Sequence, residues 1–310
     1  MYPRIRTVSA KAALACLFAA APALAQSAPT PAQAPPAKPR AEANRPVKSP
    51  GNAQWAKTVD EARKRAEAEN KLVYYEFESQ DCDDCRRMQG LLYPAFDFEA
   101  LLIGMVPVKV RYDVGDSKPL QELYGIATAP AVLITTPSGR LVFLMNGFKD
   151  APDFYAHVHK DLDLHRQLKK KLETPIDTLS AKDALAIGRE LYARKDPKAS
   201  LPYLKRASVA PNPGPAVRET ALEGLAAVEL ELGDAAASRT SIDQLIAIAK
   251  NPDQKESAEL FRAQIPLSQN NPDEALALYK KFVKDHPNSK YLSQVQSFIA
   301  RLSPPAAPAP

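Results

Sequence analysis

The sequence predicts an α/β domain, a mixed central sheet flanked by helices, followed by an all-α domain of helical repeats. Apolar patterns of strand and helix type alternate between residues 53 and 167 and end in a strand hairpin. From 168 to 302 only helical patterns follow, and similar stretches recur there about every 37 residues. Proline-rich, core-poor segments lie at 26–52 and 303–310, where we expect an extended linker and a disordered tail.

Residues 1–25 have the three parts of a secretory signal peptide: a cationic start, a short alanine-rich apolar stretch and an Ala-x-Ala cleavage site. The cationic residues are Arg4, Arg6 and Lys11. The apolar stretch is too short to cross a membrane. We therefore expect a periplasmic or secreted protein whose mature chain has no transmembrane span. Three alternatives stay open: a lipoprotein processed at Cys16, an uncleaved signal that anchors the chain, and an alanine-rich tail without a targeting role.

Cleavage of this signal would change two counts. The formal net charge of +5 would fall to about +2, which is no electrostatic footprint for nucleic acid, so we exclude that class of partner. Three cysteines would become two, Cys82 and Cys85, in an oxidising compartment. A disulfide closing so short a ring stabilises by only about 2 kcal/mol, against about 3 kcal/mol for a fifteen-residue loop. The pair is a poor crosslink, which favours a chemical role.

The expected elements of the α/β domain follow from local patterns. A first helix is indicated by apolar residues at helical spacing and a capping box, and Asn70 ends it. The residues concerned are Trp55, Val59, Ala62 and Ala66, with Thr58 and Glu61 in the box. Residues 72–77 form an aromatic and β-branched run, typical of a buried strand. A helix begins near residue 83, and Pro94 ends or kinks it.

The rest of the domain is predicted in the same way. The expected elements are a short helix at 96–103, a strand at 106–110, a helical turn at 120–124 closed by Gly125, strands at 131–135 and 141–145 joined by a turn, and a long helix capped by Asp150.

Two cysteines separated by two residues lie where the first strand leads into a helix. This spacing puts both sulfurs on one helical turn, with Cys82 at the helix N-terminus. Unpaired backbone N–H groups and the helix dipole favour a thiolate there. Because the thiolate is the attacking species in thiol–disulfide exchange, the pattern predicts an exchange site.

These features together make residues 53–167 resemble the thioredoxin fold. The resemblance rests on the strand, Cys82-x-x-Cys85 and helix unit, on the segment 124–131 with its Thr-Ala-Pro, and on Gly147 after the last strand. Trp55 and the helix that ends at residues 69–71 resemble the periplasmic thioredoxin-like branch, in which an amphipathic helix leads into the first central strand.

The resemblance implies roles for several residues. Cys82 would attack and Cys85 would resolve the mixed disulfide. The Ala129–Pro130 peptide would be cis, and Thr128 and Ala129 would dock an extended substrate near Cys82. From the residues alone, Pro130 is also compatible with an ordinary trans proline that opens a strand.

Glu76 lies six residues before Cys82, where many thioredoxins carry a buried acid. The resemblance implies that its carboxylate takes the proton from Cys85 when the mixed disulfide resolves. A solvated charge at an edge-facing position is an equal alternative.

The loop around the cysteines departs from the thioredoxin pattern, because Asp81, Asp83 and Asp84 crowd Cys82. Like charge disfavours the thiolate, whereas the helix terminus favours it. If the acids prevail, reduction or isomerisation of disulfides is favoured over disulfide donation. Alternatively the acids only stabilise the first helical turn. Arg86 and Arg87 either offset the acids or face water.

We expect no metal and no cofactor. Zinc is held by four ligands, commonly two cysteine pairs or a cysteine pair and two histidines. There is no second cysteine pair, and His157 and His159 are two apart on a helix and point different ways. His165 and His286 are isolated in the sequence.

The helical part resembles tetratricopeptide repeats, whose small residues lie where paired helices touch. Ser200, Ser238 and Ala275 occupy equivalent positions in three stretches, the segment 271–287 is the best match, and a capping helix follows near 291–302. Such repeats form a concave groove that binds a peptide or a partner domain. The alternative is a helical addition that packs on the first domain or mediates self-association.

The sequence therefore favours an exported enzyme, a thiol–disulfide oxidoreductase that acts on protein disulfides, with repeats that recruit a protein substrate or redox partner. The alternative from another class is a non-catalytic periplasmic adaptor. In that case the repeats bind the partner and the α/β domain is only a packing unit.

Overall fold

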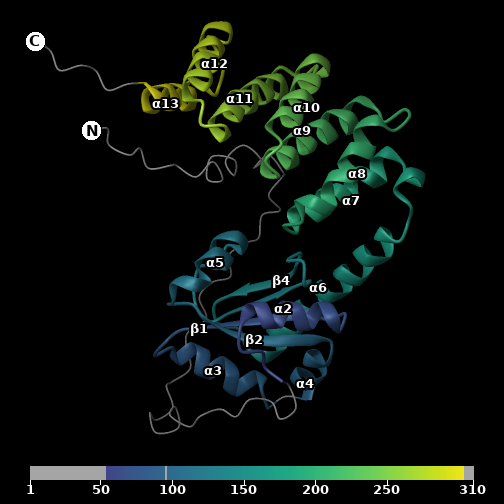
Figure 1. Cartoon of the computed structure of the whole chain (residues 1–310), viewed down its shortest axis with the longest axis vertical. Helices are drawn as coiled ribbons and strands as arrows, with labels where there is room; N and C mark the ends of the chain where they lie inside the picture. The colour runs from purple at the N-terminus through teal and green to yellow at the C-terminus, as the bar shows by residue number, and fades with distance from the viewer. Residues whose placement is uncertain (1–53, 95, 304–310) are drawn as a thin grey trace, which may run out of the picture. The chain divides into compact units, whose positions relative to one another are not determined.

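The structure of the chain, a computed structural model, describes residues 54–94 and 96–303 (Figure 1). The predicted signal peptide, the proline-rich linker and nearly all of the tail lie outside these residues. The described residues fall into two compact units, one of 54–178 with 189–200 and one of 179–188 with 201–303. The domain boundary predicted at 167/168 stays a prediction.

The first unit has, in its described residues, a four-stranded sheet with the strand order β2-β1-β3-β4. β1 and β2 are parallel, whereas β1 with β3 and β3 with β4 are antiparallel. The strands are β1 (Leu72–Glu78), β2 (Met105–Arg111), β3 (Ala131–Thr135) and β4 (Leu141–Asn146). The helices are α2 (Val59–Ala68), α3 (Asp83–Leu92), α4 (Phe96–Ile103), α5 (Lys118–Tyr124) and α6 (Ala151–Leu172). The predicted mixed sheet flanked by helices is confirmed.

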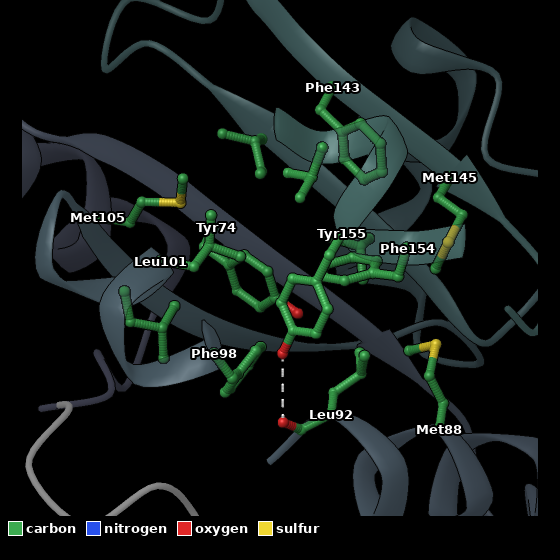
Figure 2. Packing of buried hydrophobic residues seen from close by; sticks show 14 of the residues in the cluster. Tyr74, Met88, Leu92, Phe98, Leu101, Met105, Phe143, Met145, Phe154 and Tyr155 are labelled. Atoms are coloured by element: carbon green, nitrogen blue, oxygen red, sulfur yellow. Dashed lines mark hydrogen bonds between the residues drawn. The ribbon is translucent and has the colours of Figure 1, made fainter. Parts of the chain in front are cut away.

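Each face of the sheet is buried under helices because successive side chains of a strand point to opposite sides. Tyr74 of β1 belongs to the core shared with α3, α4 and α6, and its neighbour Tyr75 belongs to the core shared with α2 and α5. Figure 2 shows the first of these cores, where the Tyr155 hydroxyl of α6 donates to the Leu92 carbonyl at the end of α3 (3.4 Å). This contact ties α6 to the helix that follows the cysteines.

The predicted helix ends are largely confirmed. Glu61 N donates to Thr58 Oγ1 (3.1 Å) at the start of α2, and Asn70 after it has a φ of 51°. Trp55, however, was expected inside this helix and lies before it. The backbone N–H of the adjacent Ala56 donates to the Pro107 carbonyl of β2 (2.8 Å). The chain before α2 is therefore a strand-like segment bridged to β2.

The start of β4 is tied to a segment far along the chain. Leu141 N donates to the Arg194 carbonyl (2.8 Å), and the Arg194 guanidinium donates back to the Leu141 carbonyl (3.3 Å). Beside them Arg140 Nε donates to Asp196 Oδ2 (2.8 Å), and each of these side chains is 16% exposed. These bonds explain why residues 189–200 group with the sheet.

The remaining helices are α7 (Ala181–Ala193), α8 (Pro197–Val209), α9 (Pro215–Glu231), α10 (Ala235–Ile248), α11 (Pro252–Ser268), α12 (Pro272–Asp285) and α13 (Leu292–Leu302). From α9 to α13 each helix packs on the next. Ser200, Ser238 and Ala275 are all fully buried, and the Ser238 hydroxyl donates to the Ala226 carbonyl of the preceding helix (2.7 Å). Ser238 and Ala275 lie at helix contacts as predicted, whereas the contact expected for Ser200 and the tetratricopeptide assignment stay predictions. Among the described helices, none has the length and apolar character needed to span a membrane.

Candidate active site

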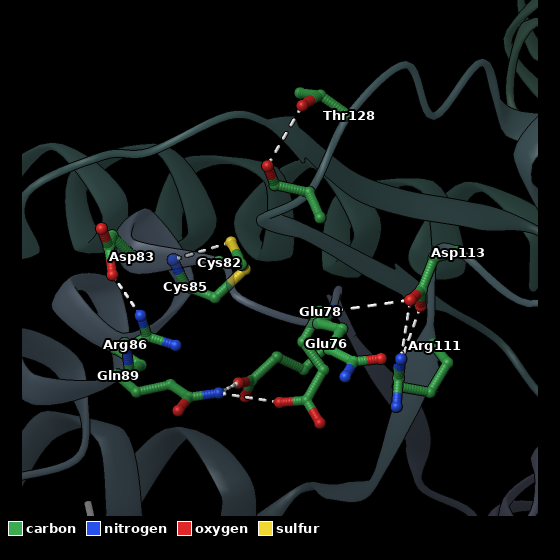
Figure 3. Close-up of a disulfide and its surroundings, with 12 residues drawn as sticks. Glu76, Glu78, Cys82, Asp83, Cys85, Arg86, Gln89, Arg111, Asp113 and Thr128 are labelled. Carbon is green, nitrogen blue, oxygen red and sulfur yellow. Dashed lines mark hydrogen bonds and ion pairs between the residues drawn. A yellow bond between two sulfur atoms is a disulfide. The ribbon is translucent and has the colours of Figure 1, made fainter. Parts of the chain in front are cut away.

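Cys82 and Cys85 form a disulfide at the start of α3 (Figure 3). Cys82 is the N-cap of the helix, and its Sγ accepts a hydrogen bond from the backbone N–H of Cys85 (3.1 Å). Cys82 is partly exposed, whereas Cys85 is only 4% exposed. Cys82 is therefore the more accessible cysteine of the pair, and the helix N-terminus donates to its sulfur.

The three aspartates of the loop lie on the surface. Asp81 has a φ of 57°, in the left-handed region that aspartate tolerates, and there the chain turns from β1 into α3. Asp83 forms an ion pair with Arg86, so part of the acidic charge beside Cys82 is offset. Arg87 instead lies over the ring of Phe148, in the loop after β4 (4.4 Å).

Glu76 is 1% exposed, so its interpretation as a solvated charge is wrong. Its carboxyl group is held by two side chains of the helix that carries the cysteines. The Tyr93 hydroxyl donates to it, 2.7 Å from Oε2 and 2.9 Å from Oε1, and Gln89 Nε2 donates to Oε1 (2.5 Å). Sequence reasoning missed both donors. Their spacing of four and eight residues from Cys85 is the signal that would have placed them on its side of the helix.

The pKa of the Glu76 carboxyl is raised above its ordinary value, because burial disfavours the ionised form. The hydrogen bonds from Tyr93 and Gln89 and the charge of Lys109 act in the opposite direction. Burial also raises the pKa of the Tyr93 hydroxyl far above its usual range, so Tyr93 stays a neutral donor. The site thus holds a carboxyl group of raised proton affinity next to the cysteine-bearing helix.

We expect this buried carboxyl to make stability fall as the pH rises. A carboxyl whose pKa is higher in the folded than in the unfolded chain contributes stability below the unfolded pKa and loses it as the pH rises through the folded pKa. In a Glu76→Gln variant this contribution is absent, so its free energy of unfolding should decline less with pH. Urea unfolding from acidic to neutral pH measures the two slopes. The same substitution at an exposed position, Glu122→Gln, is the control. Equal slopes for wild type and Glu76→Gln would contradict the prediction.

The Ala129–Pro130 peptide bond is cis, which confirms that part of the prediction. Pro130 is buried, and its carbonyl accepts a hydrogen bond from Gly147 N after β4 (2.8 Å). Thr128 is exposed, Ala129 is partly exposed, and the Thr128 hydroxyl donates to the Ala129 carbonyl (3.1 Å). Figure 3 draws Thr128 among the surroundings of the disulfide.

Two side chains that sequence reasoning did not single out hold this loop. Asn146 at the end of β4 accepts from Ala127 N (3.1 Å) and donates to the Gly125 carbonyl (3.2 Å). The Tyr112 hydroxyl, from the loop after β2, donates to the Ala127 carbonyl (2.8 Å). The backbone before Pro130 is thus fixed from two sides.

Both thiols of the described part of the chain are used by the disulfide. Within the described residues no cluster of three or more histidine, cysteine, aspartate or glutamate side chains is arranged to hold a metal ion.

No protein-family model matches the sequence, and no curated protein matches it. The solved structures that are similar to part of the chain include the following two. A thioredoxin from Thermus thermophilus shares 20% sequence identity, with 35% of this chain and 86% of that chain covered and a TM-score of 0.32. A structure described as DsbH oxidoreductase shares 17% identity, with 41% of this chain and 96% of that chain covered and a TM-score of 0.32. Likenesses of this size assign no activity to the chain.

Proposed function

We propose that the chain is an exported thiol–disulfide oxidoreductase that acts on protein disulfides through Cys82 and Cys85. One observation carries the proposal: the disulfide lies at a helix N-terminus and joins a partly exposed cysteine, Cys82, to a buried one, Cys85. A disulfide that only crosslinks so short a ring adds little stability. The asymmetry in exposure instead suits a pair in which one sulfur meets the substrate and the other completes the reaction.

The reaction begins with the dithiol form. The Cys82 thiolate, stabilised by the Cys85 N–H and the helix N-terminus, attacks a substrate disulfide. One substrate sulfur leaves as a thiolate, and a mixed disulfide with Cys82 forms. The carboxylate of Glu76 then takes the proton of the Cys85 thiol. The Cys85 thiolate attacks Cys82 Sγ, the Cys82–Cys85 bond forms, and the second substrate sulfur leaves. Two electrons pass to the substrate, and a dithiol donor must reduce the pair again.

Substrate docking and partner recruitment belong to the same proposal. Thr128 and Ala129, which are accessible on the loop before Pro130, would pair with an extended substrate segment. The helical region would recruit the protein partner as a set of tetratricopeptide-like repeats, and the sequence of residues 1–25 would direct the chain to the periplasm or outside the cell.

Insulin reduction in the presence of dithiothreitol tests the activity. The chain without its predicted signal should accelerate insulin precipitation, because its Cys82 thiolate attacks the insulin disulfides. Cys82→Ser, whose hydroxyl replaces the sulfur as a helix N-cap acceptor but which lacks the nucleophile, should fall to the rate of dithiothreitol alone. A wild-type rate no higher than that of Cys82→Ser, in every redox buffer that reduces the pair, would count against catalysis.

That negative result would favour a non-catalytic adaptor. The observation in its favour is the aspartate-rich loop, where three carboxylates surround the sulfur that should become a thiolate. An adaptor would keep its protein partners when Cys82 is replaced by serine.

A further inference from the structure

The side-chain amide of Gln89 hydrogen-bonds two carboxylates, those of Glu76 and Glu78. Glu76 and Glu78 alternate with Phe77 along β1, so their side chains lie on the same side of the sheet. Gln89 Nε2 of α3 donates to Glu76 Oε1 (2.5 Å) and to Glu78 Oε2 (3.1 Å), as Figure 3 shows. The buried carboxyl is thereby held close to one that is partly exposed.

A cation lies beside this pair. Lys109 of β2 is in register with Glu76, and its Nζ lies 3.2 Å from Glu78 Oε2. The same Nζ lies over the rings of Trp55 (5.7 Å) and Tyr93 (5.9 Å). Lys109 is therefore a positive charge whose position is set by an ion pair and two aromatic faces.

The other groups around Glu76 carry no charge at neutral pH. Tyr74 of the same strand and Tyr93, the C-cap of α3, are neutral phenols, because burial raises the pKa of both hydroxyls. The residue opposite Glu76 on β3 is the apolar Val132. Glu78 and Lys109 are thus the charges that act on Glu76, and they act with opposite signs.

The resolving sulfur is on the helix that supplies these contacts. Cys85, Gln89 and Tyr93 are spaced by four residues, so they follow one side of α3 toward β1. The same helix therefore carries the proton donor of the resolving step and both side chains that bond the proton acceptor.

We propose that Gln89, Glu78 and Lys109 are positioning residues for the resolving step: together they set how readily Glu76 takes the proton of the Cys85 thiol. The inference rests on the proposed function, in which Glu76 is that acceptor. Glu78 favours the protonated form of Glu76, while Lys109 and the Gln89 amide favour the carboxylate. A proton acceptor works best when its pKa is near the working pH. Here Glu78 raises the proton affinity of Glu76, while Lys109 and Gln89 lower it.

The resolving step can be followed by itself with an aromatic disulfide as the probe. The reduced chain attacks it through Cys82 and releases one coloured thiolate. Cys85 then attacks Cys82 Sγ and releases the second. Stopped-flow absorbance separates the two phases, and the rate of the second phase across pH reports the titration of Glu76. The wild-type second phase should accelerate as the pH rises through the pKa of Glu76, and Glu76→Gln should lack that acceleration.

The positioning residues are tested by opposite shifts of this pH profile. Glu78→Gln removes a negative neighbour, so the profile should move to lower pH and the second phase below its midpoint should become roughly three- to tenfold faster. Lys109→Gln should move the profile to higher pH and slow the second phase by a similar factor. Gln89→Met, which loses the amide donor, should also move it to higher pH. The exposed Glu99→Gln makes the same change in net charge as Glu78→Gln and should leave the profile in place.

The inference would be overturned if the midpoint of the pH profile moved in the same direction in Glu78→Gln and Lys109→Gln, or stayed unchanged in both. A merely structural role for these residues would slow both variants without moving the midpoint, and urea unfolding of each variant shows whether it is folded. Failure of the proposed function looks different, because the wild-type chain would then not accelerate insulin reduction, whatever its pH profile with the aromatic disulfide.

Discussion

A Cys85→Ser variant is expected to accumulate covalent adducts with its protein substrates, whereas Cys82→Ser forms none. Cys82 is the partly exposed sulfur at the start of α3, and its thiolate makes the first bond to the substrate. Without the buried Cys85 sulfur nothing within the site releases that bond, so the mixed disulfide persists until an external thiol reduces it. Non-reducing electrophoresis of the exported fraction, followed by mass spectrometry of bands that disappear on reduction, measures the adducts.

The double variant Cys82→Ser with Cys85→Ser is the matched control and should give no reducible bands. If Cys85→Ser gives no adducts while the wild type reduces insulin, then the order of attack assigned to the two sulfurs is wrong. If neither activity nor adducts are found, and partners still co-purify with Cys82→Ser, the adaptor is favoured.

Replacing Phe98 by alanine is expected to cost about 3 to 5 kcal/mol of stability, whereas the same change at Phe96 should cost less than about 0.5 kcal/mol. The two phenylalanines are on one helix, α4, but Phe98 is fully buried and Phe96 is 82% exposed. The Phe98 ring stacks on Tyr93 (5.1 Å between centroids) and meets Tyr74 edge-on (5.8 Å). Its removal leaves a cavity beside the tyrosine that bonds Glu76.

Urea unfolding of the wild type and both variants measures the two losses. Because the variants differ only in the position of the same substitution, helix propensity changes little between them. A loss at Phe98 no larger than at Phe96 would show that this core does not hold the sheet unit together.

The main elements of the sheet unit were predictable because each is encoded by a local pattern. The bounds of α4 follow from its apolar residues between Pro94 and Gly104, and β1 follows from an aromatic and β-branched run. The start of α6 follows from the side chain of Asp150, which accepts from Asp153 N (3.0 Å). Signals of this kind act within a few residues and need no knowledge of the rest of the chain.

The surroundings of Glu76 were not predictable in the same way. The spacing of Gln89 from Cys85 gives its side of α3, but its role depends on contacts with Glu78 and Glu76, 11 and 13 residues away in sequence. The pairing of Glu76 with Lys109 depends on the register of two parallel strands, which a connection through two helices sets. Trp55 was misplaced for a related reason: its helical spacing to Val59 competes with a strand-like bridge formed by its neighbour.

The hydrogen bonds between Leu141 and Arg194 bear on how the chain is dissected for experiments. A fragment that stops at residue 167 would strip the first residue of β4 of both bonds and leave Arg140 without its aspartate. Any excised sheet unit should therefore extend through Ser200, so that the hairpin end keeps the partners that residues 189–200 provide.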